Sequence, residues 1–333
     1  MVVYLQAGAD VDRVKRALVT RGQWVQQVDR GADGVVTSLA LAPFSAAVAP
    51  GELESIEGVL RVGRPVSEHP RVDAQGPRVV VSGVEIGGGA PPVLMSGPCA
   101  VETEERVQTL ARQLAPLGAT FLRGGAYKPR SSPYAFQGHG VEALRWLRRA
   151  ADAHGLKVVT EALAEPDVPL VAEYADLVQI GSRNMQNFAL LKATGKAGRP
   201  VLLKRAMAAT IEEWLLAGEY LLAHGAPGVI FCERGIRGFD GSTRNLLDLG
   251  AVALLAHVHR LPVIVDPSHA TGRRDLVLPL ARAALAAGAA GLMIETHDDP
   301  AQALSDGPQA LLPAQLRELE MFGRERPATG GER

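Results

Sequence analysis

Short apolar runs recur from residue 91 onward, and segments with the apolar spacing of helices separate them. Eight runs predict strands: 93–96, 120–123, 157–161, 177–180, 201–204, 229–232, 263–266 and 291–295. The helical patterns between them include 104–117, 141–154, 211–224, 246–259 and 276–287. Apolar runs without polar alternation are typical of parallel strands that are buried on both faces. Eight such units over about 240 residues suit a (β/α)8 TIM barrel, an α/β fold.

A doubly wound open sheet is the alternative for the same alternation of strands and helices. Its main support is GHGVEA at 138–143, a partial match to the dinucleotide-binding fingerprint. That run follows a loop rich in proline and serine instead of a strand, which disfavours a nucleotide role. We therefore predict a barrel domain over residues 77–333.

The first 65 residues follow a different pattern and predict a small separate domain. Strand-like and helical segments alternate there in the order βαββαβ, which suggests a ferredoxin-like fold in which the second helix is short. The polar stretch 66–76 (VSEHPRVDAQG) predicts a linker. Residues 79–86, interrupted by Gly83, predict a hairpin before the barrel.

Composition narrows the class of protein. The chain has 333 residues, a net charge of −1 and 47% hydrophobic residues, which gives no sign of a nucleic-acid or membrane surface. Two cysteines are too few for a disulfide framework and fit a reducing compartment. The N-terminus lacks the pattern of a signal peptide, and the most apolar window, 278–294, contains Arg282 and several glycines. We expect a soluble, cytoplasmic protein.

Ionisable residues stand at nearly every predicted strand end. Barrel enzymes carry their chemistry at the carboxyl ends of the strands, so these side chains should converge on one face. The set is Cys99, Arg123, Lys128, Glu161, Arg183, Lys204, Arg234, Asp266, His269 and Glu295. Its five cations predict binding of phosphates or carboxylates, and KPRSSP (128–133) adds donors for a second oxyanion. Two anionic sites imply two anionic substrates, or one substrate charged at both ends.

A metal site is predicted within this set. The thiolate of Cys99, the imidazole of His269 and the carboxylate of Glu295, with one more aspartate, suit divalent Zn, Fe, Mn or Co. The spacing leaves open which aspartate of the last loop completes the set: Asp298, Asp299 or Asp306. His297 competes as a ligand because it is two residues from Glu295, whereas Cys232 is expected to be a buried strand thiol. The metal would polarise a carbonyl as a Lewis acid.

Long motifs at these positions resemble one enzyme family. They are GPCAVE (97–102), FLRGGAYKPRSSPYAFQG (121–138), IGSRNMQN (180–187), LLKR (202–205), FCERGIR (231–237), DPSHATGRRD (266–275) and IETHDDPAQALSD (294–306). In this order they closely resemble 3-deoxy-D-arabino-heptulosonate 7-phosphate (DAHP) synthase of type Iβ, over residues 77–312. The resemblance implies condensation of phosphoenolpyruvate with erythrose 4-phosphate, the first step of the shikimate pathway toward chorismate and the aromatic amino acids.

The resemblance also implies roles for single residues. Four positions match the family's metal ligands, which selects Asp306 over His297: Cys99, His269, Glu295 and Asp306. Five match the cations that bind phosphoenolpyruvate: Arg123, Lys128, Arg183, Lys204 and Arg234. Arg130 and Ser131 match the aldose-phosphate contacts, and Glu161 is placed near the substrates by position only. Cys99 and His269 are predicted to take part in catalysis as metal ligands. Lys128 is our candidate for the proton donor to the aldehyde oxygen, and Asp266 is our candidate for the residue that positions or deprotonates water.

Other functions are weighed against this one. 3-Deoxy-manno-octulosonate 8-phosphate synthase shares the chemistry but takes arabinose 5-phosphate, and KPRSS favours erythrose 4-phosphate. A non-catalytic barrel that binds phospho-ligands is disfavoured by the intact metal positions. The resemblance further implies a homotetramer and feedback inhibition by tyrosine or phenylalanine through residues 1–65. Arg273 and Arg274 are expected to stabilise the loop or a subunit contact.

Overall fold

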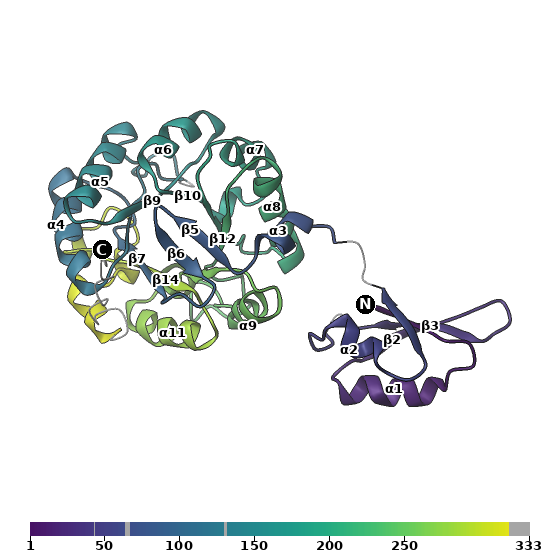
Figure 1. Cartoon of the computed structure of the whole chain (residues 1–333). Helices are drawn as coiled ribbons and strands as arrows, with labels where there is room; N and C mark the ends of the chain where they lie inside the picture. The colour runs from purple at the N-terminus through teal and green to yellow at the C-terminus, as the bar shows by residue number, and fades with distance from the viewer. Residues whose placement is uncertain (43, 64–66, 130–131, 320–333) are drawn as a thin grey trace, which may run out of the picture. The chain divides into compact units, whose positions relative to one another are not determined.

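The computed structural model describes residues 1–42, 44–63, 67–129 and 132–319. The chain divides into two compact units, Met1–Glu68 and the segment from His69 onward, each with a hydrophobic core of its own (Figure 1). Within the described residues, no helix has both the length and the apolar character needed to cross a bilayer.

The N-terminal unit is an antiparallel sheet with two helices. Its elements are β1 (Val2–Leu5), α1 (Val11–Thr20), β2 (Val25–Arg30), β3 (Val36–Leu41), α2 (Pro50–Glu54) and β4 (Val59–Gly63). The strands pair in the order β2-β3-β1-β4. Helix α1 begins at the Asp10 cap, whose carboxylate accepts a hydrogen bond from Arg13 N, and it buries Val14 and Leu18 in the core of the unit. The predicted order βαββαβ is confirmed, and α2 is five residues long.

The second unit is a closed barrel of eight parallel strands, which confirms the predicted fold and excludes the open sheet. The strands are β7 (Val93–Gly97), β8 (Phe121–Arg123), β9 (Lys157–Glu161), β10 (Leu177–Ile180), β11 (Val201–Lys204), β12 (Val229–Glu233), β13 (Val263–Val265) and β14 (Gly291–Glu295). Pairing of β14 with β7, with Leu292 opposite Leu94, closes the ring. The register places the carboxyl ends of all these strands at one face of the barrel.

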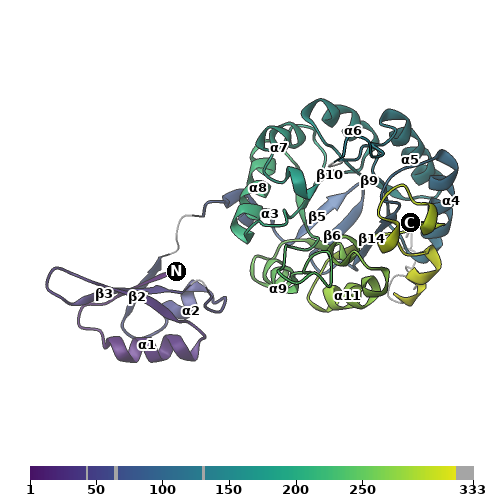
Figure 2. The same cartoon turned by 180° about the vertical axis from the view of Figure 1, so that it is seen from behind.

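Helices surround the strands on the outside of the barrel (Figures 1 and 2). They are α4 (Glu104–Leu114), α5 (Val141–Ala153), α6 (Val168–Tyr174), α7 (Phe188–Gly195), α8 (Ile211–Ala223), α9 (Leu249–Ala253) and α11 (Arg274–Ala286). The short helix α10 (Pro267–Thr271) instead follows the carboxyl end of β13. Alternate strand residues such as Met95, Phe121 and Ile230 form a separate buried cluster inside the ring. The predicted hairpin before the barrel is confirmed: β5 (Arg78–Val81) pairs with β6 (Val84–Gly87). Its apolar side chains join the buried cluster inside the ring.

The stretch predicted as a linker, 66–76, contains a helix instead. Residues Pro70–Gln75 form α3, and the carboxylate of Glu219 on α8 accepts hydrogen bonds from the backbone N–H groups of Arg71 and Val72 at the start of this helix. The stretch is polar because its helix is short and Val72 is its one buried residue, which is why the sequence suggested a linker. What holds the helix is a carboxylate 147 residues away, which local sequence does not reveal.

Candidate active site

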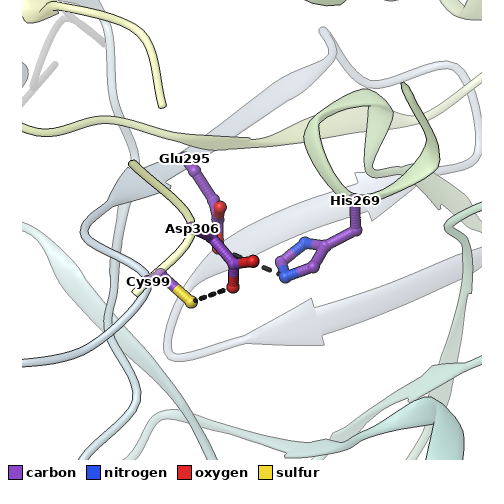
Figure 3. Close-up of side chains that lie close together, drawn as sticks. All are labelled: Cys99, His269, Glu295 and Asp306. Carbon is purple, nitrogen blue, oxygen red and sulfur yellow. Dashed lines mark hydrogen bonds and ion pairs between the residues drawn. The ribbon is translucent and has the colours of Figure 1, made fainter. Parts of the chain in front are cut away.

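Four residues at the carboxyl end of the barrel form a compact group of possible metal ligands. One ligand atom from each of Cys99, His269, Glu295 and Asp306 lies within 4.8 Å of the others (Figure 3). Cys99 follows β7, Glu295 ends β14, and Asp306 lies in the loop after β14. His269 lies in α10, which begins directly after β13 because Pro267 cannot continue the strand but suits the first turn of a helix.

Cys99 is buried and protonated at neutral pH in this environment. The pKa of the thiol is raised from 9.0 to about 12, mainly by burial and also by Glu295, while Lys128 and Arg123 act in the opposite direction. Its Sγ donates a hydrogen bond to Asp306 Oδ2 at 2.9 Å. A metal ion that binds the Cys99 thiolate would take the place of this proton. Cys99 Sγ and Asp306 Oδ2 are therefore already close enough together to bind the same ion.

The ring of His269 is oriented by Asp266, the capping residue of α10. Asp266 Oδ1 accepts a hydrogen bond from His269 N at 3.0 Å, and Oδ2 accepts one from Nδ1 at 2.7 Å. Nδ1 therefore carries the proton and leaves Nε2 free, 3.2 Å from Glu295 Oε1. Burial lowers the pKa of His269 despite Asp266, which keeps the imidazole neutral and able to bind a metal at neutral pH.

Both carboxylates of the group are ionised at neutral pH. Burial tends to raise the pKa of Glu295, but the charge of Arg123 opposes it and the pKa falls below its usual value. Gln309 Nε2 donates to Glu295 Oε2 at 2.6 Å and so fixes the carboxylate. Burial likewise opposes ionisation of Asp306, yet the hydrogen bond from the Cys99 thiol and the charge of Arg244 hold its pKa low. A thiol, a neutral imidazole and two carboxylates fit a divalent transition metal.

The competing donors of the last loop are turned away from this group. His297 Nε2 faces Glu102 Oε2 at 3.3 Å. Asp298 forms an ion pair with Arg106, and Asp299 accepts a hydrogen bond from Ala301 N. Asp306 is thus the aspartate that the fold brings next to Cys99.

The predicted anion-binding residues surround one cavity of about 220 Å³ beside the metal group. Its lining includes Arg123, Lys128, Glu161, Arg183, Lys204, Arg234, His269 and Asp306. Lys128 Nζ lies 2.9 Å from both Cys99 O and Cys99 Sγ. The lysine side chain fits there because residue 125 is glycine: a Cβ at that position would lie only 2.6 Å from Lys128 Cδ. Arg130 and Ser131, predicted to bind the aldose phosphate, lie outside the described residues.

Arg234 is a cation of the cavity whose burial is only partly compensated. Burial lowers the pKa of Arg234 even though Asp266 acts in the opposite direction. Nε of Arg123 is buried and has no hydrogen-bond partner in the described part of the chain. Buried cations need a counter-charge, and an anionic ligand in this cavity would supply it.

Asp266 lies behind the cavity instead of facing it. Its side chain is fully buried, and its carboxylate is bound by His269 and by Lys204 Nζ at 2.5 Å. This arrangement suits a residue that orients two others, and it leaves little room for the predicted contact with water.

Two residues of the site escaped sequence reasoning. Arg244 lines the cavity and donates to Asp306 Oδ1 at 3.1 Å, and Gln309 fixes Glu295. Arg244 lies in a loop with no strand-end position to mark it, and a glutamine has no charge to draw attention. The only available signal was the closeness of Gln309 to Asp306 in the sequence.

Comparison with known proteins agrees with this site. A model of the DAHP synthetase I family matches residues 67–329. A phospho-2-dehydro-3-deoxyheptonate aldolase of Thermotoga maritima is 52% identical over 260 residues, which cover 78% of this chain and 77% of the relative. A 2-dehydro-3-deoxyphosphooctonate aldolase of Acidithiobacillus ferrooxidans is 34% identical over 246 residues, 68% of this chain and 86% of the relative.

Solved structures give the same picture. The crystal structure of phospho-2-dehydro-3-deoxyheptonate aldolase (DAHP synthase) from Thermotoga maritima superimposes with a TM-score of 0.73 at 41% identity, covering 96% of this chain and 94% of that one. A truncated form of 3-deoxy-D-arabino-heptulosonate 7-phosphate synthase from the same organism gives a TM-score of 0.67 at 48% identity, over 73% of this chain and 90% of that one.

Proposed function

This chain belongs to the DAHP synthetase I family, and we propose on that premise how its barrel joins phosphoenolpyruvate to erythrose 4-phosphate. The reaction is that of a DAHP synthase, a transferase step of the shikimate pathway. The octulosonate alternative is less favoured, because those relatives are 34% identical or less, against 52% for the heptonate enzyme. The observation that carries the proposal is a group of four metal-ligand side chains next to a cavity lined by cations.

Cys99, His269, Glu295 and Asp306 would hold a divalent ion, with Mn, Fe, Zn and Co all compatible with these donors. When bound, the ion supplies a Lewis acid for the aldehyde carbonyl of the sugar phosphate. The neutral imidazole and the two ionised carboxylates support this assignment, since metal ligands must be deprotonated.

The cations hold the two substrates in reacting positions. Arg123, Lys204 and Arg234 are buried and would bind the phosphate and carboxylate of phosphoenolpyruvate. Arg183 and Lys128 line the same cavity, and Glu161 lies beside them, where Gln179 Nε2 donates to its carboxylate at 2.9 Å. The proposal keeps Arg130 and Ser131 as contacts of the aldose phosphate. Fixing both substrates converts a bimolecular step into an effectively unimolecular one.

The bond changes require one proton donor and one water. The enol carbon of phosphoenolpyruvate attacks the aldehyde carbon, and the new carbon–carbon bond leaves the aldehyde oxygen in need of a proton, which Lys128 Nζ donates. Water then adds at C2, and one of its protons replaces the one that Lys128 gave up. The bond between C2 and the phosphate oxygen breaks, the C2 ketone forms, and the second proton leaves with inorganic phosphate. Asp266 keeps His269 and Lys204 in position during these steps.

The choice of aldose tests the proposed function. We expect kcat/KM for erythrose 4-phosphate to exceed that for arabinose 5-phosphate by about 100-fold or more. Arabinose 5-phosphate is one carbon longer, so it cannot pair its aldehyde and its phosphate at the same time with groups placed for the shorter sugar. The measurement is release of inorganic phosphate with each aldose, phosphoenolpyruvate and a divalent metal. Faster turnover of arabinose 5-phosphate would contradict the assignment.

Residues 1–65, which lie in the compact unit Met1–Glu68, are proposed to be a ferredoxin-like regulatory domain that binds tyrosine or phenylalanine, in a chain that assembles as a homotetramer. The unit has its own core, built from residues such as Val3, Leu18 and Leu39. No catalytic group of the proposed site comes from it.

Deleting residues 1–68 should therefore abolish inhibition by these amino acids and leave turnover nearly unchanged. Initial rates of the full chain and the shortened chain are compared with and without each amino acid. Inhibition that persists after the deletion, or a full chain that neither amino acid inhibits, would refute the regulatory role.

A further inference from the structure

A buried carboxylate outside the metal group connects the two loops that carry metal ligands. Glu102 lies three residues after Cys99 and its exposure is 6%. Its Oε1 accepts a hydrogen bond from Leu304 N at 2.7 Å, two residues before Asp306. Its Oε2 accepts a hydrogen bond from Arg106 and faces His297. One side chain thus joins the loop after β7 to the loop after β14.

The proton arrangement of His297 is set by a second contact. Its Nδ1 accepts a hydrogen bond from Asp299 N at 3.0 Å, so the proton of the neutral ring is on Nε2, the atom that faces Glu102. Arg106, which bonds Glu102, also forms an ion pair with Asp298 through Nε at 2.9 Å. The segment after β14 is therefore held to Glu102 at its beginning, through His297 and Arg106, and near its end, through Leu304.

The loop needs such support because of the backbone at Asp306. This residue has φ of +54°, a left-handed conformation that a residue with a side chain rarely adopts without support from its surroundings. The next residue, Gly307, is packed so tightly that a Cβ would lie 2.3 Å from Pro300 O. A loop with a strained ligand position does not keep that geometry by local preference alone.

We propose that Glu102 is a positioning residue that holds the Asp306 loop in the conformation in which Asp306 ligates the metal. This inference rests on the proposed metal site, and it adds a residue that contacts neither metal nor substrate. The Glu102 backbone carbonyl also binds the segment that precedes α5, because it accepts a hydrogen bond from His139 Nε2 at 3.0 Å. The ring of His139 packs edge-on against Phe136 and Trp146, which lie on either side of it in the sequence.

The test measures Co²⁺ binding to the full chain without substrates. Glu102→Ala should weaken Co²⁺ binding by about 10- to 100-fold, the loss typical when a partner of a metal ligand is removed. Glu102→Gln keeps an acceptor for Leu304 N–H but turns an NH2 donor toward Arg106 and His297, so it should restore only part of the affinity. All four metal ligands remain in Glu102→Ala. At saturating metal its kcat should therefore lie closer to that of the unsubstituted chain than its Co²⁺ affinity does.

Glu104→Gln is the matched control, since Glu104 lies two residues away and pairs with Arg149 on the surface. It should leave Co²⁺ affinity unchanged. If Glu102→Ala does not fold, Glu102→Asp is used, because it keeps the charge but is one methylene too short to reach Leu304 N. Co²⁺ affinity equal to that of the unsubstituted chain in Glu102→Ala, or in Glu102→Asp where the alanine variant does not fold, would overturn the inference.

The result is separable from that of the aldose assay. Weakened Co²⁺ binding in a chain that turns over neither aldose would support the role of Glu102 and refute the proposed reaction. Normal turnover of erythrose 4-phosphate with unchanged Co²⁺ affinity in the Glu102 variants would do the reverse.

Discussion

Replacing Cys99 by alanine is expected to remove the bound metal and to lower kcat by about 1000-fold or more. The substitution takes away the thiolate from a group of four ligand atoms that lie within 4.8 Å of one another. A Lewis acid at a developing oxygen charge contributes several kcal/mol, and each 1.36 kcal/mol changes the rate about tenfold. Metal content of the purified protein and phosphate release measure the two effects.

Cys232→Ala is the matched control for this substitution. Cys232 is the other free cysteine, and it is equally buried, but it lies inside the barrel among apolar side chains such as Ile230 and Ile264. Its replacement should cost roughly 1 kcal/mol of stability through lost packing and should leave metal content unchanged. Full turnover of Cys99→Ala without metal would show that the metal site is assigned wrongly.

The barrel was predictable because its signal is local and repeated. Each strand is a short apolar run, and β12, for example, is buried at every position from Val229 to Glu233. The convergence of strand ends then follows from the fold, so the sequence alone places Arg123, Lys204 and Glu295 at one face. The same logic identified the cavity lining, since the residues at the ends of neighbouring strands must meet.

The parts that escaped prediction depend on contacts between loops. Arg244 reaches Asp306 from a loop 62 residues away, and Glu102 binds Leu304 across 202 residues. Periodicity carries no information about such pairs, because each loop has no regular spacing of its own. Asp266 shows a different limit: its position at a strand end was clear from the sequence, but its use by His269 and Lys204 appears only when the neighbours are known.

Lys128→Met is expected to lower kcat by about 100- to 10,000-fold, the range for loss of a positioned general acid. Lys128 is the cation of the cavity that contacts the thiol of the metal group, with Nζ 2.9 Å from Cys99 Sγ. Its ammonium is therefore close to the position that the aldehyde oxygen would take next to the metal ligands. Steady-state kinetics at saturating metal and phosphoenolpyruvate measure the loss, and Lys192→Met on the exposed side of α7 is the control.

Lys128→Arg separates proton transfer from simple charge. Arginine keeps the positive charge beside Cys99 but does not give up its proton in the range where the enzyme works. If Lys128 only balances negative charge in the site, the arginine variant should recover most of the turnover that methionine loses. If Lys128 protonates the aldehyde oxygen, Lys128→Arg should stay within about tenfold of Lys128→Met in kcat while its KM for phosphoenolpyruvate remains close to that of the unsubstituted chain. Near-complete recovery by arginine would therefore refute the proton-donor role and leave Lys128 as a substrate-binding cation.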